Sequence, residues 1–165
     1  MNYSKVIYTL LLSIVFSLGM QAQNKIPELN KDILKYVKSV KGKKVDRGEC
    51  WDLAYQALTR VNADWDKAFI YGDPIDPMKD IVYPGDLIQF ENVKTRYTEG
   101  RTTYTSSMGQ HTAIVYKVIE KGIYEIAHQN TQFSGRKVGV NTLNLNHVIE
   151  GDYYFYRPTK KRQNE

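Results

Sequence analysis

The stretch VDRGECWDLAYQAL, residues 45–58, contains Cys50, the single cysteine of this 165-residue chain. After this cysteine, apolar residues recur at three- and four-residue steps, which predicts an amphipathic helix. Gly48 interrupts the pattern just before it, so we expect Cys50 on the first helical turn. The unpaired N–H groups and positive dipole end at that position favour an anion. We therefore expect a thiol shifted toward thiolate, the form that attacks carbonyl carbons, and interpret Cys50 as a hydrolase nucleophile.

Residues 1–22 have the pattern of an export signal peptide. Lys5 precedes an apolar run over residues 6–20, and Gln21-Ala22 supplies a plausible cleavage end. The run is about 15 residues long, whereas a membrane-spanning helix needs roughly 20. A retained N-terminal anchor is the alternative. We expect an exported protein, periplasmic or extracellular after signal removal, with no integral membrane segment in the mature chain.

The remainder has the size of a single domain, which we place at residues 23–158, followed by a charged tail at 159–165. Cysteines of exported proteins usually form disulfides, because the environment is oxidising. A lone cysteine is therefore a candidate reactive thiol, and the alternative is a small buried apolar residue.

The net charge of +5 indicates a weakly basic protein. This balance suits an anionic polymer such as cell wall only weakly, and we favour a solvated surface with a basic tail as its explanation. The chain has no zinc-finger spacing, basic helix or base-stacking motif, which argues against a nucleic-acid partner. We expect a monomer.

The apolar pattern predicts two helices followed by several strands, an α+β arrangement. The polar segment 91–110 is either a long functional loop or a hairpin around Glu99-Gly100 that carries Tyr97 and Tyr104 on its arms. The predicted helices cover residues 26–40 and 50–62, and the predicted strands cover residues 87–90, 111–119, 123–130, 138–145 and 152–156.

A cysteine hydrolase needs a histidine to handle the thiol proton and a third polar group to orient that imidazole. His111 opens a strand and is our candidate general base. If the loop of the 111–130 hairpin has an even number of residues, Asn130 lies opposite Ala113 and diagonal to His111. His111, His128 and Asn130 then share one face of the sheet. An odd loop places Asn130 on the other face.

Each of these residues has a second interpretation. His111 is then a strand-end histidine bonded to backbone, and Asn130 caps the strand. His128 is the orienting group, a partner that holds Asn130, or a buried neutral histidine; we favour the partner of Asn130. His147 is interpreted as a surface or loop residue.

We expect neither a cofactor nor a metal ion. Cys50, His111 and His128 are of residue types that bind zinc, but their spacing matches no established zinc pattern. Beside the nucleophile, we assign Trp51 and Asp46 to substrate binding. For Asp46, solvation of the helix start and contact with a cation are the alternatives.

Four segments together resemble the CHAP family, the cysteine, histidine-dependent amidohydrolase/peptidases. This family is related to NlpC-type cell-wall peptidases and to papain. The resemblance extends over roughly residues 50–156. The segments are Gly48-Glu-Cys-Trp51, Pro84-Gly-Asp-Leu-Ile-Gln-Phe90, Gly109-Gln-His-Thr-Ala-Ile-Val115 and Ala127-His-Gln-Asn130.

The resemblance implies a papain-like α+β fold, in which the cysteine helix packs on an antiparallel sheet that carries the histidine. By position, Cys50 matches the nucleophile, His111 the general base and Asn130 the residue that orients it. The chain departs from the family at His128, where many members have an acidic residue, and this leaves room for His128 as the third member.

These observations predict an exported cysteine hydrolase that cleaves amide bonds of peptidoglycan, as an amidase or an endopeptidase. Its partner is then peptidoglycan or a peptide. Two alternatives remain: an acyltransferase that uses the same thiol, and an inactive papain-fold module that binds wall or another partner.

Overall fold

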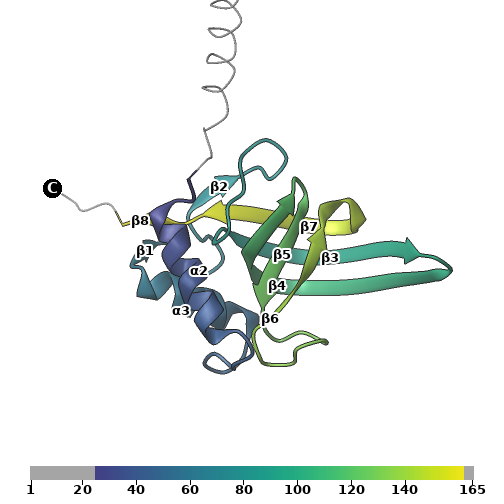
Figure 1. The fold of residues 1–165 in the computed structure, drawn as a ribbon, viewed down its shortest axis with the longest axis horizontal. Coiled ribbons are helices and arrows are strands. Elements are labelled where there is room, and N and C mark those ends of the chain that lie inside the picture. Colours follow the sequence, from purple (N-terminus) through teal and green to yellow (C-terminus); the bar gives the residue numbers. More distant parts are fainter. Residues whose placement is uncertain (1–24, 162–165) are drawn as a thin grey trace, which may run out of the picture.

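Two helices and a six-stranded antiparallel sheet make up most of the fold (Figure 1). The computed structural model describes residues 25–161, so the signal peptide expected at residues 1–22 lies outside the described residues. Among residues 25–161, no helix combines the length and the apolar character needed to cross a membrane. The α+β class predicted from the sequence is confirmed.

The helices α2 (Glu28–Val40) and α3 (Cys50–Arg60) begin and end within about two residues of their predicted bounds. The sheet has the strand order β2-β7-β3-β4-β5-β6, and β1 and β8 form a separate two-stranded pair. The remaining elements are β1 (Ala63–Asp64), β2 (Asp73–Ile75), β3 (Leu87–Glu99), β4 (Thr102–Glu120), β5 (Ile123–His128), β6 (Gly139–Asn144), the 3₁₀ turn η1 (Leu145–His147), β7 (Val148–Arg157) and β8 (Thr159–Lys160).

Both helices bury their apolar stripes against one face of the sheet. In α3, Leu53 and Leu58 are fully covered, and the sheet contributes Leu87 and Ile114 to the same core. Burying each such leucine or isoleucine stabilises the fold by about 1.5–3 kcal/mol. This packing fixes the first turn of α3 beside the middle of β4.

The opposite face of the sheet encloses a second apolar core. Alternate residues of β3 point to the two cores, since Leu87 belongs to the first and Ile88 and Phe90 to the second. Tyr124 and Phe155 complete this second core with ring centroids 5.4 Å apart. The sheet is therefore buried on both faces over its central part.

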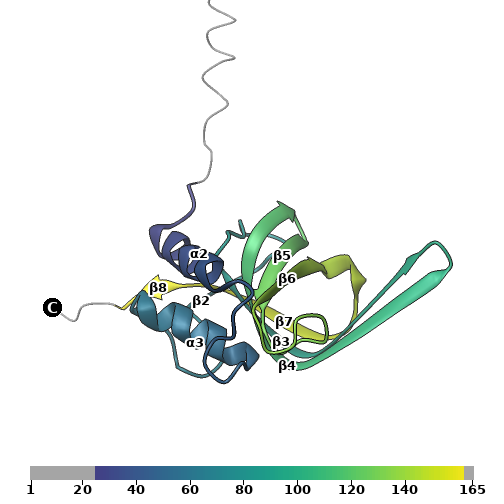
Figure 2. The same ribbon diagram turned by 60° about the horizontal axis from the view of Figure 1, so that its bottom comes forward.

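The segment left open as loop or hairpin is a hairpin. Strand β3 pairs with β4 without interruption from Thr95↔Ser106 to Glu99↔Thr102, and the turn contains Gly100 at φ 59°. Strand β7 accompanies β3 only as far as Thr95↔Val148. Residues 96–105, which we call the hairpin arm, therefore project beyond the rest of the sheet (Figure 2).

The residues expected to form a charged tail begin with a strand. Thr159 and Lys160 of β8 pair with Asp64 and Ala63 of β1. Residues 162–165 lie outside the described part of the chain.

Candidate active site

Helix α3 begins at Cys50, in agreement with the sequence prediction. Gly48 has φ 90°, a conformation that side chains disfavour, and lets the chain turn into the helix. The backbone N–H of Glu49 donates to Oδ2 of buried Asp52 at 3.0 Å, which is half of a capping box. Arg47 donates to the same carboxylate. The first turn is thus held in place from both sides of Cys50.

The pKa of the Cys50 thiol is shifted in the direction opposite to the one expected from the sequence. Burial raises its pKa, and the neighbouring Glu49 carboxylate adds to the increase, while backbone N–H groups of Thr112 and Trp51 oppose it. This direction is opposite to the expected shift toward thiolate, because loss of solvation outweighs the backbone hydrogen bonds to the sulfur.

His111 on β4 and His128 at the end of β5 form a direct contact. Nε2 of His111 lies 2.8 Å from Nδ1 of His128, and the two rings meet edge to face. The residues are only 9% and 3% exposed. Burial lowers the pKa of His111 to about 4 and that of His128 to about 3, so both rings are neutral at neutral pH. The contact occupies Nε2 of His111 and leaves its Nδ1 available to another group.

Asn130 does not take the position predicted from a regular hairpin. The loop has two residues, and Glu120 pairs with Ile123, but two register shifts follow along the strands. Ala127 consequently pairs with Ile114, a register that places His128 opposite Ala113 and diagonal to His111. Strand β5 ends at His128, and Asn130 has φ 62°, so the chain turns away before Asn130 can lie across from His111. The structure therefore brings His128, and not Asn130, into hydrogen-bond contact with His111.

The side chain of Asn130 instead contacts the residue before the nucleophile. It donates to Oε2 of Glu49 at 2.7 Å, and Arg136 donates to Oε1 of the same carboxylate at 2.7 Å. Gln129 adds a hydrogen bond to the Glu49 carbonyl at 2.7 Å. A Cβ at Gly48 would lie 2.7 Å from Cβ of Arg136. These contacts attach residues 129–136, which we call the latch loop, to the segment that directly precedes Cys50.

A buried polar network lies behind Cys50. The hydroxyl of Tyr71 is 2.9 Å from Oγ1 of Thr112, and both hydroxyls lie within 3.2 Å of Oε1 of Gln89. This network fixes the part of β4 that carries His111. Gln89 and Tyr71 were assigned no role from the sequence, because nothing in a single sequence reveals polar pairing across strands.

The candidate reacting groups open onto one cleft of about 670 Å³. Cys50, His111 and His128 line one end, and Asn130 of the latch loop lies beside them. The cleft continues to the hairpin arm, where Tyr104 forms part of its wall.

Trp51 and Asp46, the residues assigned to substrate binding, are not among the described residues that line this cleft. The ring of Trp51 stacks on Tyr55 at 4.9 Å, and its Nε1 donates to the carbonyl of Ala68 at 2.8 Å. Asp46 is exposed at φ 51° in the turn before Gly48. Within residues 25–161, no group of three or more His, Cys, Asp or Glu side chains is arranged to hold a metal ion.

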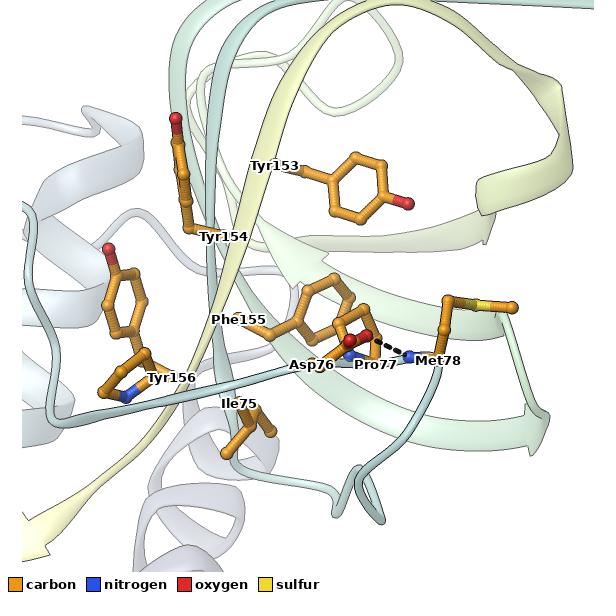
Figure 3. A pocket seen from close by; sticks show the side chains of 9 residues that line it. Ile75, Asp76, Pro77, Met78, Tyr153, Tyr154, Phe155 and Tyr156 are labelled. Atoms are coloured by element: carbon orange, nitrogen blue, oxygen red, sulfur yellow. Dashed lines mark hydrogen bonds between the residues drawn. The ribbon is translucent and has the colours of Figure 1, made fainter.

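A smaller cleft of about 270 Å³ lies beside β2 and β7. Met78, Tyr153 and Tyr154 contribute to its wall, and the side chain of Asp76 accepts a hydrogen bond from the backbone of Met78 (Figure 3). No cysteine or histidine is among the described residues that line it.

The structure has a cysteine at the N-terminus of a helix, this helix packs on an antiparallel sheet, and a strand of that sheet carries a histidine. This combination defines the class of papain-like cysteine proteinase folds. A sequence profile described as "AIM3/BBC1 Cysteine proteinase-fold domain" matches residues 23–164. The chain belongs to this family. The finer assignment to the CHAP family stays a prediction.

A search of the curated proteins gave no match. Among solved structures, the chain is similar to "The crystal structure of Ly7917", with 16% sequence identity and a TM-score of 0.47. The similarity covers 77% of this chain and 62% of that chain, so this chain spans less than two thirds of that protein.

Proposed function

We propose that this protein is a cysteine hydrolase of amide bonds, with Cys50 as nucleophile, His111 as general base and His128 as the group that orients His111. The observation that carries this proposal is the 2.8 Å contact between the two histidines at the end of the cleft that Cys50 also lines. The cysteine proteinase fold of the family supports the same reaction class.

The reaction starts from a neutral thiol and a neutral imidazole, since burial disfavours both charged forms. In the active tautomer, the Nε2–H of His111 donates to Nδ1 of His128, which leaves the Nδ1 lone pair of His111 to take the thiol proton. The sulfur of Cys50 attacks the amide carbonyl carbon as that proton leaves. The backbone N–H of Cys50, at the helix N-terminus, stabilises the oxyanion.

The imidazolium of His111 then gives its proton to the leaving amine, and an acyl-enzyme remains on Cys50. A water molecule, deprotonated by the same imidazole, releases the acid and restores the thiol. His128 accepts a hydrogen bond from His111 throughout and fixes its tautomer. Asn130 acts on the other side of the site, where it holds the carboxylate of Glu49.

We infer that the substrate is peptidoglycan, cleaved at an amide bond outside the cytoplasm. The resemblance of the four sequence segments to cell-wall amidohydrolases and the expected signal peptide support this substrate. The test is to digest purified wall fragments with the wild-type protein and with Cys50→Ala, and to quantify new amino termini by mass spectrometry. Release by the wild type alone is expected, and equal release by both proteins contradicts the proposal.

One observation favours an inactive binding module as the second candidate: the thiol is buried beside a carboxylate, and its pKa is raised. In that case, wild type and Cys50→Ala bind wall fragments equally, and neither releases amines. An acyltransferase using the same thiol is separated from a hydrolase by adding an amine acceptor and searching for its acylated product.

A further inference from the structure

Away from the candidate reacting groups, the described cleft is lined by uncharged side chains. It is lined by the hydroxyl side chains of Thr105 on the hairpin arm and of Ser106 next to it, and by the amides of Asn141 and Asn144. The only formally charged residue among its described lining is Glu49, at the Cys50 end. The chain contains 23 lysines and arginines, yet none of them lines the described cleft.

Three aromatic rings stack on one another at the end of the cleft next to the hairpin arm. Tyr97 and Tyr104 are paired across β3 and β4, and their rings stack with centroids 4.9 Å apart at 16°. The ring of His147, from η1, lies 5.0 Å from that of Tyr97 at 15°. The amide of Asn144 contacts Nε2 of His147 at 3.3 Å. The stack connects the hairpin arm to the body of the sheet. The three rings are therefore already in place without a bound ligand.

We propose that this part of the cleft is a subsite for a neutral N-acetylated glycan, so that the sugar side of the substrate lies along the hairpin arm. This proposal rests on the hydrolase function proposed above. A sugar ring presents apolar C–H faces that pack on aromatic side chains such as Tyr104. Its hydroxyl and acetamido groups exchange hydrogen bonds with hydroxyl and amide side chains, which are both donors and acceptors.

The absence of cationic groups from the described lining argues against an anionic polymer. A charged chain would lose its hydration in this cleft without gaining an opposite charge. A neutral polar chain loses less and is compensated by the hydroxyl and amide groups.

The length of the subsite requires an oligosaccharide. Tyr104 and His111 are seven positions apart on β4, a separation of about 23 Å at roughly 3.3 Å per strand residue. We therefore expect a chain of several sugar units to bind, and a monosaccharide to bind much more weakly.

The test is a titration with the tetrasaccharide of N-acetylglucosamine, followed by calorimetry or by NMR shifts. Tyr104→Ala should weaken binding at least tenfold, whereas Tyr104→Phe should keep it, because the aromatic face is what binds. Tyr154→Ala is the matched control: Tyr154 is 43% exposed against 45% for Tyr104, and it lines the smaller cleft. We expect wild-type affinity for this control. Thermal unfolding of each variant verifies the fold.

No tetrasaccharide binding at millimolar concentration, or equal weakening by Tyr104→Ala and Tyr154→Ala, overturns the subsite. Displacement of the tetrasaccharide by a sugar-free stem peptide also overturns it, since the arm is then a peptide site.

The binding assay does not depend on turnover, so its failure is separable from failure of the proposed function. Equal hydrolysis of sugar-linked and sugar-free peptides removes the subsite and leaves the hydrolase. Tetrasaccharide binding that is sensitive to Tyr104→Ala, in a protein that releases no amines, supports the subsite and removes the hydrolase.

Discussion

His128 should matter more to the reaction than Asn130, because it is the side chain that touches His111. His128→Ala leaves Nε2 of His111 without its partner and allows the wrong tautomer, so we expect kcat to fall by about 10²–10⁴. His128→Asn retains an acceptor and should recover part of the loss. The measurement is kcat and KM on wall fragments across pH.

Asn130→Ala is the control for this prediction. It removes a hydrogen bond to Glu49 and leaves the two histidines in contact, so we expect less than about a tenfold loss. A larger effect from Asn130→Ala than from His128→Ala would restore Asn130 as the orienting group.

The two histidines also make the fold sensitive to acid. Their pKa values in the folded protein, about 4 and about 3, lie below the value of about 6.5 expected for an unfolded chain. The unfolded state therefore takes up protons first as the pH falls, and the free energy of unfolding decreases from pH 6.5 down through pH 4. For His111 alone, the loss approaches about 3 kcal/mol. Denaturant unfolding at a series of pH values measures it.

His128→Asn should flatten this pH dependence, since it removes one of the two titrating groups, whereas Asn130→Ala should keep the wild-type slope. If both variants retain the full slope between pH 6.5 and 4, the acid sensitivity arises from other groups.

The sequence predicted these residues to different extents. Gly48 and the apolar pattern after Cys50 placed the cysteine on the first helical turn. The choice between His128 and Asn130 depended on two register shifts between β4 and β5 and on the end of β5 at His128, for which the residue types gave no signal. The contacts of Glu49 depend on the path of the latch loop, which has no periodic pattern.

At the scale of elements, the latch loop affects the reactivity of the Cys50 thiol through the residue that it holds, Glu49. Glu49→Gln removes the carboxylate that helps to raise the pKa of Cys50, so this pKa should fall and labelling by iodoacetamide at neutral pH should accelerate a few-fold. Arg136→Met breaks the same ion pair but leaves the carboxylate unneutralised, so labelling should slow. The rates are measured across pH for both variants.

Opposite effects of these two substitutions indicate that charge controls the thiol. If Glu49→Gln and Arg136→Met both accelerate labelling, loosening of the loop exposes the sulfur, and the electrostatic explanation is wrong.

Strands and helices with one buried face were predictable, because burial imposes a period on the sequence. The hairpin arm had no such period, since its residues are exposed on both faces. The sequence therefore left segment 91–110 open between a loop and a hairpin. The short strand β8 was missed for a related reason: its two residues are too few to form a pattern.

At the scale of the whole molecule, the structure separates a packed body from a projecting arm. Among the described residues, neither apolar core contains a member from positions 96–105, and β7 pairs with β3 only up to Thr95. The body holds the candidate reacting groups, and the arm holds two of the three stacked rings.

This separation predicts that the arm can be removed without unfolding the body. Thr95 and Ser106 are paired across the hairpin, so residues 96–105 can be replaced by Asn-Gly, which favours a two-residue turn. The shortened protein should unfold cooperatively, with a free energy of unfolding within about 1 kcal/mol of wild type, because exposed residues contribute little. It should keep its reaction with a sugar-free amide substrate and lose tetrasaccharide binding. Loss of cooperative unfolding would mean that the stack of Tyr97 on His147 supports the body, and that binding and stability cannot be divided between arm and sheet.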